Sequence, residues 1–331
     1  MGVRIALGGD TMLGRGVGEE ITDHGPYGLF AREVVEELRR ADLRLLNLEC
    51  CISTRGTEEP TARFHFRAPP GAVETLRALR VDCVTLANNH TLDYGDSALE
   101  DTLTSLREAG IQTVGAGRNQ AEARAPAILN ARNMTIAVLG VTDHPQAYAA
   151  TETTPGVAYA PLNREIPAWL TKDIQQLSNI HNAVVITPHW GPNMTTAPQP
   201  YIRAAAQKFL EAGATLVAGH SAHVFHAATP RVIYDLGDLI DDYIRDRKLR
   251  NDLSLLWTTE IKETRQTSHK ALPLHLTYAH TSKATGEDQK WIKTRLATAC
   301  TEFDTEVIEQ EGLTVVTDEQ ASNTSNHEVK G

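Results

Sequence analysis

The chain has 331 residues, and its 42 acidic side chains outnumber the 32 Lys and Arg, which gives a formal net charge of −10. This balance argues against nucleic acid or an anionic membrane surface as the main partner, because both attract clustered Lys and Arg. No apolar run is long enough to span a bilayer, and the N-terminus has no signal-peptide pattern. We therefore expect a cytoplasmic protein without a membrane segment.

Short apolar runs that end in polar residues recur along the first 240 residues, and each is typical of a buried strand. In chain order they cover residues 3–10, 43–49, 81–90, 111–117, 134–144, 183–191, 214–223 and 231–238. Stretches with apolar residues at helical spacing lie between them, at 31–41, 70–80, 97–110 and 199–214. Strands that alternate with helices predict an α/β fold with mainly parallel pairing.

The pattern changes after residue 250. Residues 254–261 and 272–278 read as two antiparallel strands, and residues 287–303 as a closing helix. The end of the chain is polar and unpatterned, which is typical of a disordered tail. We expect a single domain over residues 1–310 and a disordered tail over residues 311–331.

Polar side chains cluster directly after the predicted strands, where parallel strands open onto one edge of a sheet and ligands bind. The residues in this position are Asp10, Glu49, Asn88, Asn89, His90, His189, His220 and His223. A single histidine there is usually a structural residue, but a set of this size is not explained in that way. This clustering is the main functional signal in the sequence.

The side chains of this cluster are suited to a metal ion. The segment GHSAH places His220 and His223 three residues apart after a strand, and Asn89 offers an amide oxygen. Asp10 and Glu49 add carboxylates, which suit Ca or Mg, while the mixed oxygen and nitrogen set suits Mn, Fe or Zn. We therefore predict one or two divalent ions, held by Asp10, Glu49, Asn89, His189, His220 and His223. In the alternative interpretation, His189 and His223 are core residues or outer neighbours of the ion.

The motifs GGDTMLGR, NLE, FHFRAPP, ANNHTLDYG, VGAGRN, PHWG, GHSAH and IYDLGD occur in this order. Together they resemble the CapA family, which is named for capsular poly-γ-glutamate synthesis and is similar to the calcineurin-like metallophosphoesterases. The resemblance implies a layered α/β/β/α sandwich of the calcineurin-like metallo-dependent phosphatase fold. It places the six predicted ligands where that fold keeps its metal ligands, and His90 where the phosphoesterases keep an acid/base histidine.

Two departures from the family pattern bear on the chemistry. The phosphoesterases open with Asp-x-His, but Met12 stands at the histidine position here, so one imidazole ligand is missing. The stretch YDLGD adds Asp235 and Asp238 close to GHSAH. His90 with Asp93 forms one predicted acid/base pair, and His220 or His223 with Asp235 or Asp238 forms a second. The alternative for Asp235 and Asp238 is that they are solvated turn residues.

Two acid/base pairs around a metal-bound substrate indicate proton removal from a carbon and return to its opposite face. The leading hypothesis is therefore Cα epimerisation of a residue in a precursor peptide, as in the CapA-like enzymes of lasso-peptide biosynthesis that this chain resembles. The second hypothesis is metal-dependent hydrolysis of a phosphoester or of a γ-glutamyl or other amide bond. The third is a binding module that keeps its metal for structure.

Three further residues are candidates for contacts with a peptide substrate. Arg63 and Arg67 flank an alternating segment and are suited to holding a carboxylate, although pairing with surface acids is the alternative. Trp190 follows His189 directly and either walls the site or packs in the core.

Overall fold

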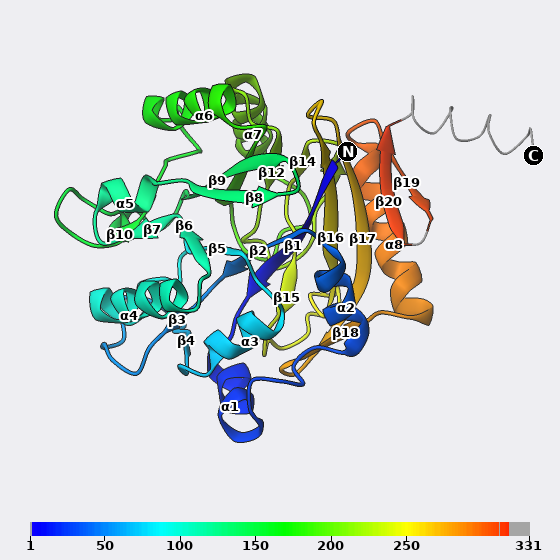
Figure 1. Cartoon of the computed structure of the whole chain (residues 1–331). Coiled ribbons are helices and arrows are strands. Elements are labelled where there is room, and N and C mark those ends of the chain that lie inside the picture. Colours follow the sequence, from blue (N-terminus) through cyan, green and yellow to red (C-terminus); the bar gives the residue numbers. More distant parts are fainter. Residues whose placement is uncertain (1, 311, 318–331) are drawn as a thin grey trace, which may run out of the picture.

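The computed structural model describes residues 2–310 and 312–317 and contains two large β-sheets (Figure 1). The larger sheet has ten strands. Its main order is β19 (Thr305–Glu309), β20 (Leu313–Thr317), β17 (Thr267–Thr277), β16 (Leu253–Lys262), β1 (Gly2–Thr11), β2 (Leu43–Leu48), β5 (Cys83–Thr85) and β6 (Gln112–Val114). In addition, β15 (Asp238–Ile240) pairs with β1, and β18 (His280–Lys283) pairs with β17.

The second sheet has six strands. Their order is β13 (Ala228–Thr229), β14 (Val232–Ile233), β12 (Leu216–Ala218), β11 (Ala183–His189), β9 (Met134–Thr142) and β8 (Ala127–Ala131). Two short pairs complete the strands, β3 (Cys51–Ile52) with β4 (Arg67–Ala68) and β7 (Ala116–Gly117) with β10 (Gly156–Val157). In both sheets the central strands run parallel, so their carboxyl ends lie at one edge.

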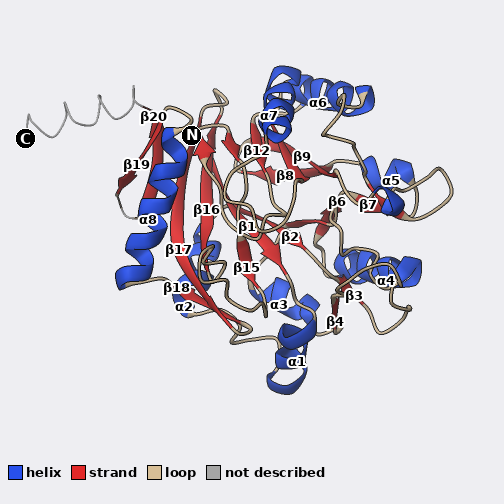
Figure 2. Ribbon diagram, turned by 180° about the vertical axis from the view of Figure 1, so that it is seen from behind, coloured by secondary structure: helices blue, strands red, loops and turns tan. Residues whose placement is uncertain are grey.

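Helices cover the outer faces of the two sheets (Figures 1 and 2). The helices are α1 (Arg15–His24), α2 (Arg32–Arg40), α3 (Ala72–Ala78), α4 (Gly95–Glu108), α5 (Gln120–Arg124), α6 (Ala168–Ile180), α7 (Pro200–Ala212) and α8 (Gly286–Thr301), with a 3₁₀ turn η1 (Gln146–Tyr148). Helices α1 to α4 lie on the ten-stranded sheet, whereas α6 and α7 lie on the six-stranded sheet. The result is the predicted α/β/β/α sandwich.

The alternation of side chains in β1 shows how one strand serves two cores. Val3, Ile5 and Leu7 are buried in the core cluster that also contains Val138 of β9 and thus joins the two sheets. Ala6, between them, belongs to the core cluster beneath α1 to α4. Successive side chains of a strand point to opposite faces, so a strand buried on both sides reads as a continuous apolar run.

The predicted α/β class and layered sandwich are confirmed, but the sequence analysis did not predict every element, and α1, α5, α6 and β20 are among those that it missed. Helix α6 fills the gap between the predicted strands at 134–144 and 183–191. Strand β20 lies inside the predicted disordered tail, because Leu313–Thr317 pairs with both β19 and β17. The tail prediction is therefore wrong for these residues, and residues 318–331 lie outside the described part of the chain.

Within the described residues, no helix combines the length and the apolar character needed to cross a membrane.

Candidate metal centre

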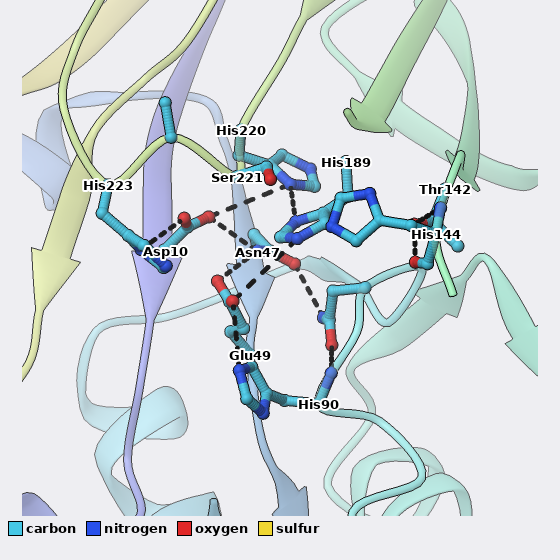
Figure 3. A network of polar contacts seen from close by, with 12 residues as sticks. Asp10, Asn47, Glu49, His90, Thr142, His144, His189, His220, Ser221 and His223 are labelled. Carbon is cyan, nitrogen blue, oxygen red and sulfur yellow. Dashed lines mark hydrogen bonds and ion pairs between the residues drawn. The ribbon is translucent and has the colours of Figure 1, made fainter. Parts of the chain in front are cut away.

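The polar residues predicted to cluster do meet at the edge where the parallel strands end (Figure 3). Asp10 lies near the end of β1, and Glu49 directly follows β2. His189 is the last residue of β11, and His220 comes two residues after β12. Because β1 and β2 belong to one sheet and β11 and β12 to the other, both sheets contribute to the same site.

Asp10 is held at the centre of the site by contacts on two sides. Its Oδ2 lies 3.1 Å from Nδ1 of His223, and that nitrogen is also 2.9 Å from Oδ1 of Asp238. On the other side, the amide of Asn47 donates to Asp10 Oδ1 over 2.7 Å and to Glu49 Oε2 over 3.2 Å. Asn47 therefore sets the spacing of the two carboxylates that the first sheet supplies.

The second sheet supplies two imidazoles that lie against each other. Nδ1 of His189 and Nδ1 of His220 are 2.9 Å apart, and Nε2 of His220 contacts Oγ1 of Thr187 over 2.9 Å. A hydroxyl on the remote nitrogen fixes the ring orientation and the tautomer, as the outer partners of metal-binding histidines do. Asp10, His189 and His220 each offer a ligand atom within 4.8 Å of the others.

His90 lies at the margin of the cluster and forms a pair with a buried carboxylate. Its Nδ1 is 2.7 Å from Oδ2 of Asp93, which also accepts a hydrogen bond from the Phe66 amide over 2.7 Å. Its Nε2 faces the site and lies 3.9 Å from Oε1 of Glu49. This arrangement leaves Nε2 as the nitrogen that is free to give or take a proton.

The two neighbouring asparagines have different roles. Asn88 is fully buried and bonded, because its amide donates to Asn47 and to the Leu48 carbonyl while its Oδ1 accepts from the His90 amide. Asn89 has a buried Oδ1 with no hydrogen-bond partner among the described residues. Asn88 therefore shapes the turn, whereas Asn89, the predicted ligand, is the one whose oxygen is left unpaired.

Several buried atoms of this cluster lack any hydrogen-bond partner in the described part of the chain. They are Asp10 Oδ2, Glu49 Oε1, Asn89 Oδ1, His189 Nε2, His223 Nε2 and Asp238 Oδ2. Leaving one such atom unpaired costs about 1–3 kcal/mol, and buried polar groups are otherwise satisfied. Five of these six residues are predicted ligands, so the donor set fits a divalent cation.

The charges of the site also favour a cation. Burial, together with the nearby Asp10 carboxylate, raises the pKa of Glu49 well above its usual range. Burial, together with the neighbouring His220, holds the pKa of His189 well below its usual range. A bound divalent cation stabilises ionised carboxylates and neutral imidazoles, which are the forms that act as ligands.

The GHSAH loop reaches the site through a strained backbone. Ser221 has a φ of 122° and His223 a φ of 57°, in a region that residues other than glycine rarely adopt. Asp235 holds the loop in this form, because its carboxylate accepts hydrogen bonds from the amides of Ala222 (2.8 Å) and Gly237 (2.9 Å). The prediction that Asp235 pairs with a histidine is therefore corrected, and Asp238 takes that place.

A cavity of about 560 Å³ opens beside the cluster and is lined by Asn89, His90 and His223. Arg63, a predicted substrate contact, also lines it. Arg67 does not, because its guanidinium lies 4.0 Å from the centre of the Tyr94 ring on another part of the surface.

Trp190 does not line the cavity either, so the predicted substrate contact is corrected to a core contact. Only 1% of the residue is exposed, its Nε1 donates to the Tyr234 carbonyl over 2.9 Å, and its ring stacks on Phe209. An indole whose N–H and faces are all engaged within the core is a packing residue.

The sequence analysis did not identify several residues of the site. Asn47 and Thr187 are polar positions inside apolar strand runs, a signal that was present in the sequence. Tyr243 lines the cavity and makes a T-shaped contact with His223, with the ring centroids 5.2 Å apart. The ring centroids of His144 and His189 are also 5.2 Å apart. His144 stands at the polar end of the predicted run 134–144 and was open either to reach the site or to have no role, whereas the loop residue Tyr243 carried no such signal, because only the tertiary fold brings it here.

The layered sandwich, with a buried Asp/His cluster at the carboxyl ends of its strands, defines a protein of the calcineurin-like metallophosphoesterase fold class. A family model described as bacterial capsule synthesis protein PGA_cap matches residues 4–243. The chain belongs to this family, as the sequence resemblance implied.

Two curated relatives illustrate the family. The chain is 28% identical to the probable polyglutamine synthesis accessory protein of Mycobacterium tuberculosis, over 92% of this chain and 93% of the relative. It is 29% identical to the capsule biosynthesis protein CapA of Bacillus anthracis, over 71% of this chain and 58% of that relative.

Among solved structures, the fold is similar to that of a putative 5′-nucleotidase from Staphylococcus aureus. The TM-score is 0.50 at 15% sequence identity, and the match covers 88% of this chain and 58% of the nucleotidase chain. These similarities show the family and the fold, and they do not show the lasso-peptide branch.

Proposed function

We propose that the protein is a metal-dependent hydrolase whose centre lies between the two sheets. The observation that carries the proposal is the convergence of unpaired buried ligand atoms from both sheets next to the His90–Asp93 pair. Asp10, Glu49, Asn89, His189, His220 and His223 would hold the ion or ions. When bound, a divalent cation supplies Lewis-acid polarisation of the substrate and lowers the pKa of water.

His90 is the proton carrier in this proposal. The hydrogen bond between its Nδ1 and Asp93 fixes the ring orientation and the tautomer, while Nε2 faces the cavity. Protonated His90 then donates its Nε2 proton to the leaving oxygen or nitrogen as the scissile bond breaks. Positioned general acids of this kind contribute roughly 10²–10⁴-fold to the rate.

The substrate bond is a phosphoester or a γ-glutamyl or other amide bond. The names of the relatives, which refer to polyglutamine synthesis and to capsule biosynthesis, support the amide. Met12 is buried in the core beneath α1 to α4, so it offers no ligand where the phosphoesterases have a histidine. This difference also favours the amide over the phosphoester.

The proposal is tested with p-nitrophenyl phosphate, bis-p-nitrophenyl phosphate and γ-glutamyl-p-nitroanilide after removal of metals. We expect Mn, Zn, Ca or Mg to restore release of nitroaniline or nitrophenol, and EDTA to abolish it. The variant His90→Gln should lose turnover while keeping its metal content. If every metal leaves all three substrates intact, and a glutamyl peptide stays uncleaved as well, the hydrolase proposal is wrong.

Epimerisation at a peptide Cα is the second candidate, and one observation favours it. Three histidines line the cavity, and two of them are bonded to a fully buried carboxylate: His90 to Asp93 at 2.7 Å, and His223 to Asp238 at 2.9 Å. In this reaction one imidazole removes the α-proton, and the other imidazolium returns a proton to the opposite face of the carbanion. The peptide keeps its atoms, and only the configuration changes.

Mass spectrometry of peptides incubated in D₂O distinguishes the two candidates. Epimerisation replaces one carbon-bound hydrogen by deuterium without cleaving the chain, whereas hydrolysis adds water and gives two products. EDTA should abolish either reaction. Deuterium uptake that persists in both His90→Gln and His223→Gln would rule out the two-base mechanism.

A further inference from the structure

Exposed apolar side chains gather around the mouth of the cavity next to the metal centre. Phe64, Met194 and Ile244 are 52%, 38% and 93% exposed, and all three line this cavity. They come from three loops that are far apart in the sequence, after β3, β11 and β15. Exposed apolar groups that cluster at a cavity mark a binding surface, whereas scattered ones need no explanation.

The loops that carry these side chains are held in place. The amide of Met194 donates to the Ala222 carbonyl of the GHSAH loop over 2.9 Å, and Met194 has a φ of 57°. The amide of Asn251 donates to the Ile244 carbonyl over 3.3 Å, and its Oδ1 accepts from Asp246. The loop of Met194 is therefore tied to the GHSAH loop by a backbone hydrogen bond, and the loop of Ile244 is held by the side-chain amide of buried Asn251.

The polar lining of the cavity is basic, although the whole chain is acidic. Arg15 and Arg63 contribute guanidinium groups, and no Asp or Glu is among the described residues that line the cavity. Arg15 is also bonded to Asp242 at 3.2 Å, but Arg63 is exposed beside Phe64. A carboxylate is the complement that a guanidinium at the rim recognises best.

We propose that this cavity selects a peptide that carries a bulky apolar side chain next to a carboxylate. This inference rests on the proposed function and names the substrate class of the same site. Phe64, Met194 and Ile244 would cover the apolar side chain, and Arg63 would bind the carboxylate. A cavity of about 560 Å³ holds more than a single phosphate group. A polyglutamate chain would instead press carboxylates against the apolar rim, at a cost in desolvation.

The test measures binding of fluorescein-labelled hexapeptides by fluorescence anisotropy, with the full chain and in the presence of EDTA. The probes share a Gly/Ser frame and contain Leu followed by Asp, Leu with a free C-terminal carboxylate, Leu with a C-terminal amide, or Glu followed by Asp. A γ-linked glutamate hexamer and a dodecanoyl probe complete the set. We expect the Leu probes with either carboxylate to bind about tenfold more tightly than the Glu probe.

Two exposed isoleucines supply matched variants. Ile244→Ser removes an apolar group of the rim, while Ile180→Ser changes an isoleucine that is 73% exposed at the end of α6. We expect about a tenfold loss of affinity in the first and none in the second. Arg63→Gln should erase the preference for a carboxylate over the amide, whereas exposed Arg247→Gln should not.

Three outcomes would overturn the inference. These are tighter binding of the γ-linked hexamer than of the Leu probes, equal effects of Ile244→Ser and Ile180→Ser, and a preference for the dodecanoyl probe, which would indicate a lipid ligand. Failure of every Leu probe to bind also counts against it. Because binding is measured without metal, these results are independent of whether the hydrolase proposal holds.

Discussion

Asp93 acts on the site only through His90, because its carboxylate is fully buried and bonded to the imidazole and to the Phe66 amide. Asp93→Asn keeps the shape but removes the carboxylate that accepts the Nδ1 proton and so fixes the tautomer of the ring. We expect turnover to fall roughly 10²-fold or more and metal content to stay normal. Steady-state kinetics and elemental analysis of the purified protein measure the two quantities.

Asp96 provides the control for this change, since it is exposed in the first turn of α4, three residues further along the chain. Asp96→Asn should keep full turnover. If Asp93→Asn retains activity while His90→Gln loses it, the carboxylate is a packing residue and does not assist the proton transfer.

The neighbours Asn88 and Asn89 show what the sequence could and could not specify at the residue scale. Both follow a strand and both are amides, so their position does not rank them, and it was the family resemblance that selected Asn89. The distinction comes from Asn47, which lies on another strand and engages Asn88. Contacts between strands that are far apart in sequence decide which of two adjacent side chains is left to bind an ion.

At the scale of elements, Gly9 sets the distance between β1 and the segment before β15. A Cβ built on Gly9 would lie 1.7 Å from the carbonyl oxygen of Gly237, which accepts a hydrogen bond from the Asp10 amide. Gly9→Ala must therefore move β1 and, with it, Asp10. We expect a loss of about 1–3 kcal/mol in the free energy of unfolding and weaker cation binding.

Urea denaturation and calorimetric titration with Mn measure these two effects. Gly71→Ala is the control, because its Cβ would meet only a methyl group of Ile21, at 3.3 Å, in an ordinary backbone conformation. Unchanged cation affinity in Gly9→Ala would show that the position of Asp10 does not depend on this strand contact.

His269 in β17 joins the two sheets and is fully buried. Its Nε2 bonds to the Thr229 carbonyl of β13 over 2.9 Å, and its Nδ1 to the Thr259 hydroxyl over 2.8 Å. Burial lowers its pKa from 6.5 to about 4. The unfolded chain therefore binds a proton below pH 6.5 that the folded chain does not bind until about pH 4, so acid favours unfolding in this interval.

The contribution of His269 to the free energy of unfolding should thus be constant above pH 6.5. It should fall by at most about 3 kcal/mol as the pH drops from 6.5 to about 4. Urea denaturation of the wild type and of His269→Gln across the interval measures the contribution. We expect a shallower slope for the variant, and the wild-type slope for His24→Gln, whose side chain is 68% exposed. Equal slopes in all three proteins would contradict the assignment.

The central strands were predictable because burial on both faces leaves an unbroken apolar run, as in β1 and β11. Strand β20 was not predictable in this way, because its pairing with β17 joins residues such as His269 and Val315 that are distant in sequence. The same limit applies to the rim of the cavity. Loop side chains such as Ile244 have no periodic pattern, and only the packed sheets bring them together.

For the whole molecule, the buried carboxylates and imidazoles predict a strong link between ion binding and stability. An ion that binds only the folded chain at a hundred times its Kd adds about 2.7 kcal/mol to the free energy of unfolding. We therefore expect Mn or Ca to raise the melting temperature by several degrees and EDTA to reverse the change. Differential scanning fluorimetry over a series of cation concentrations measures this shift.

The rise in melting temperature with Mn or Ca should disappear in the double variant Glu49→Gln/His223→Asn. This variant lacks one ligand at the end of β2 and one in the GHSAH loop. Exposed Glu108→Gln at the end of α4 should respond like the wild type. A shift of the same size in all variants would place the ion elsewhere on the protein.

The division of the site between two sheets has a consequence for how the protein is made. Asp10 leaves the ribosome more than two hundred residues before His220, His223 and Asp238, which lie beside it in the folded site. A nascent chain therefore cannot capture the ion until most of it has been translated and the second sheet has docked on the first. The metal then reaches a chain in which both sheets have formed, and a translation product truncated before the GHSAH loop remains without it.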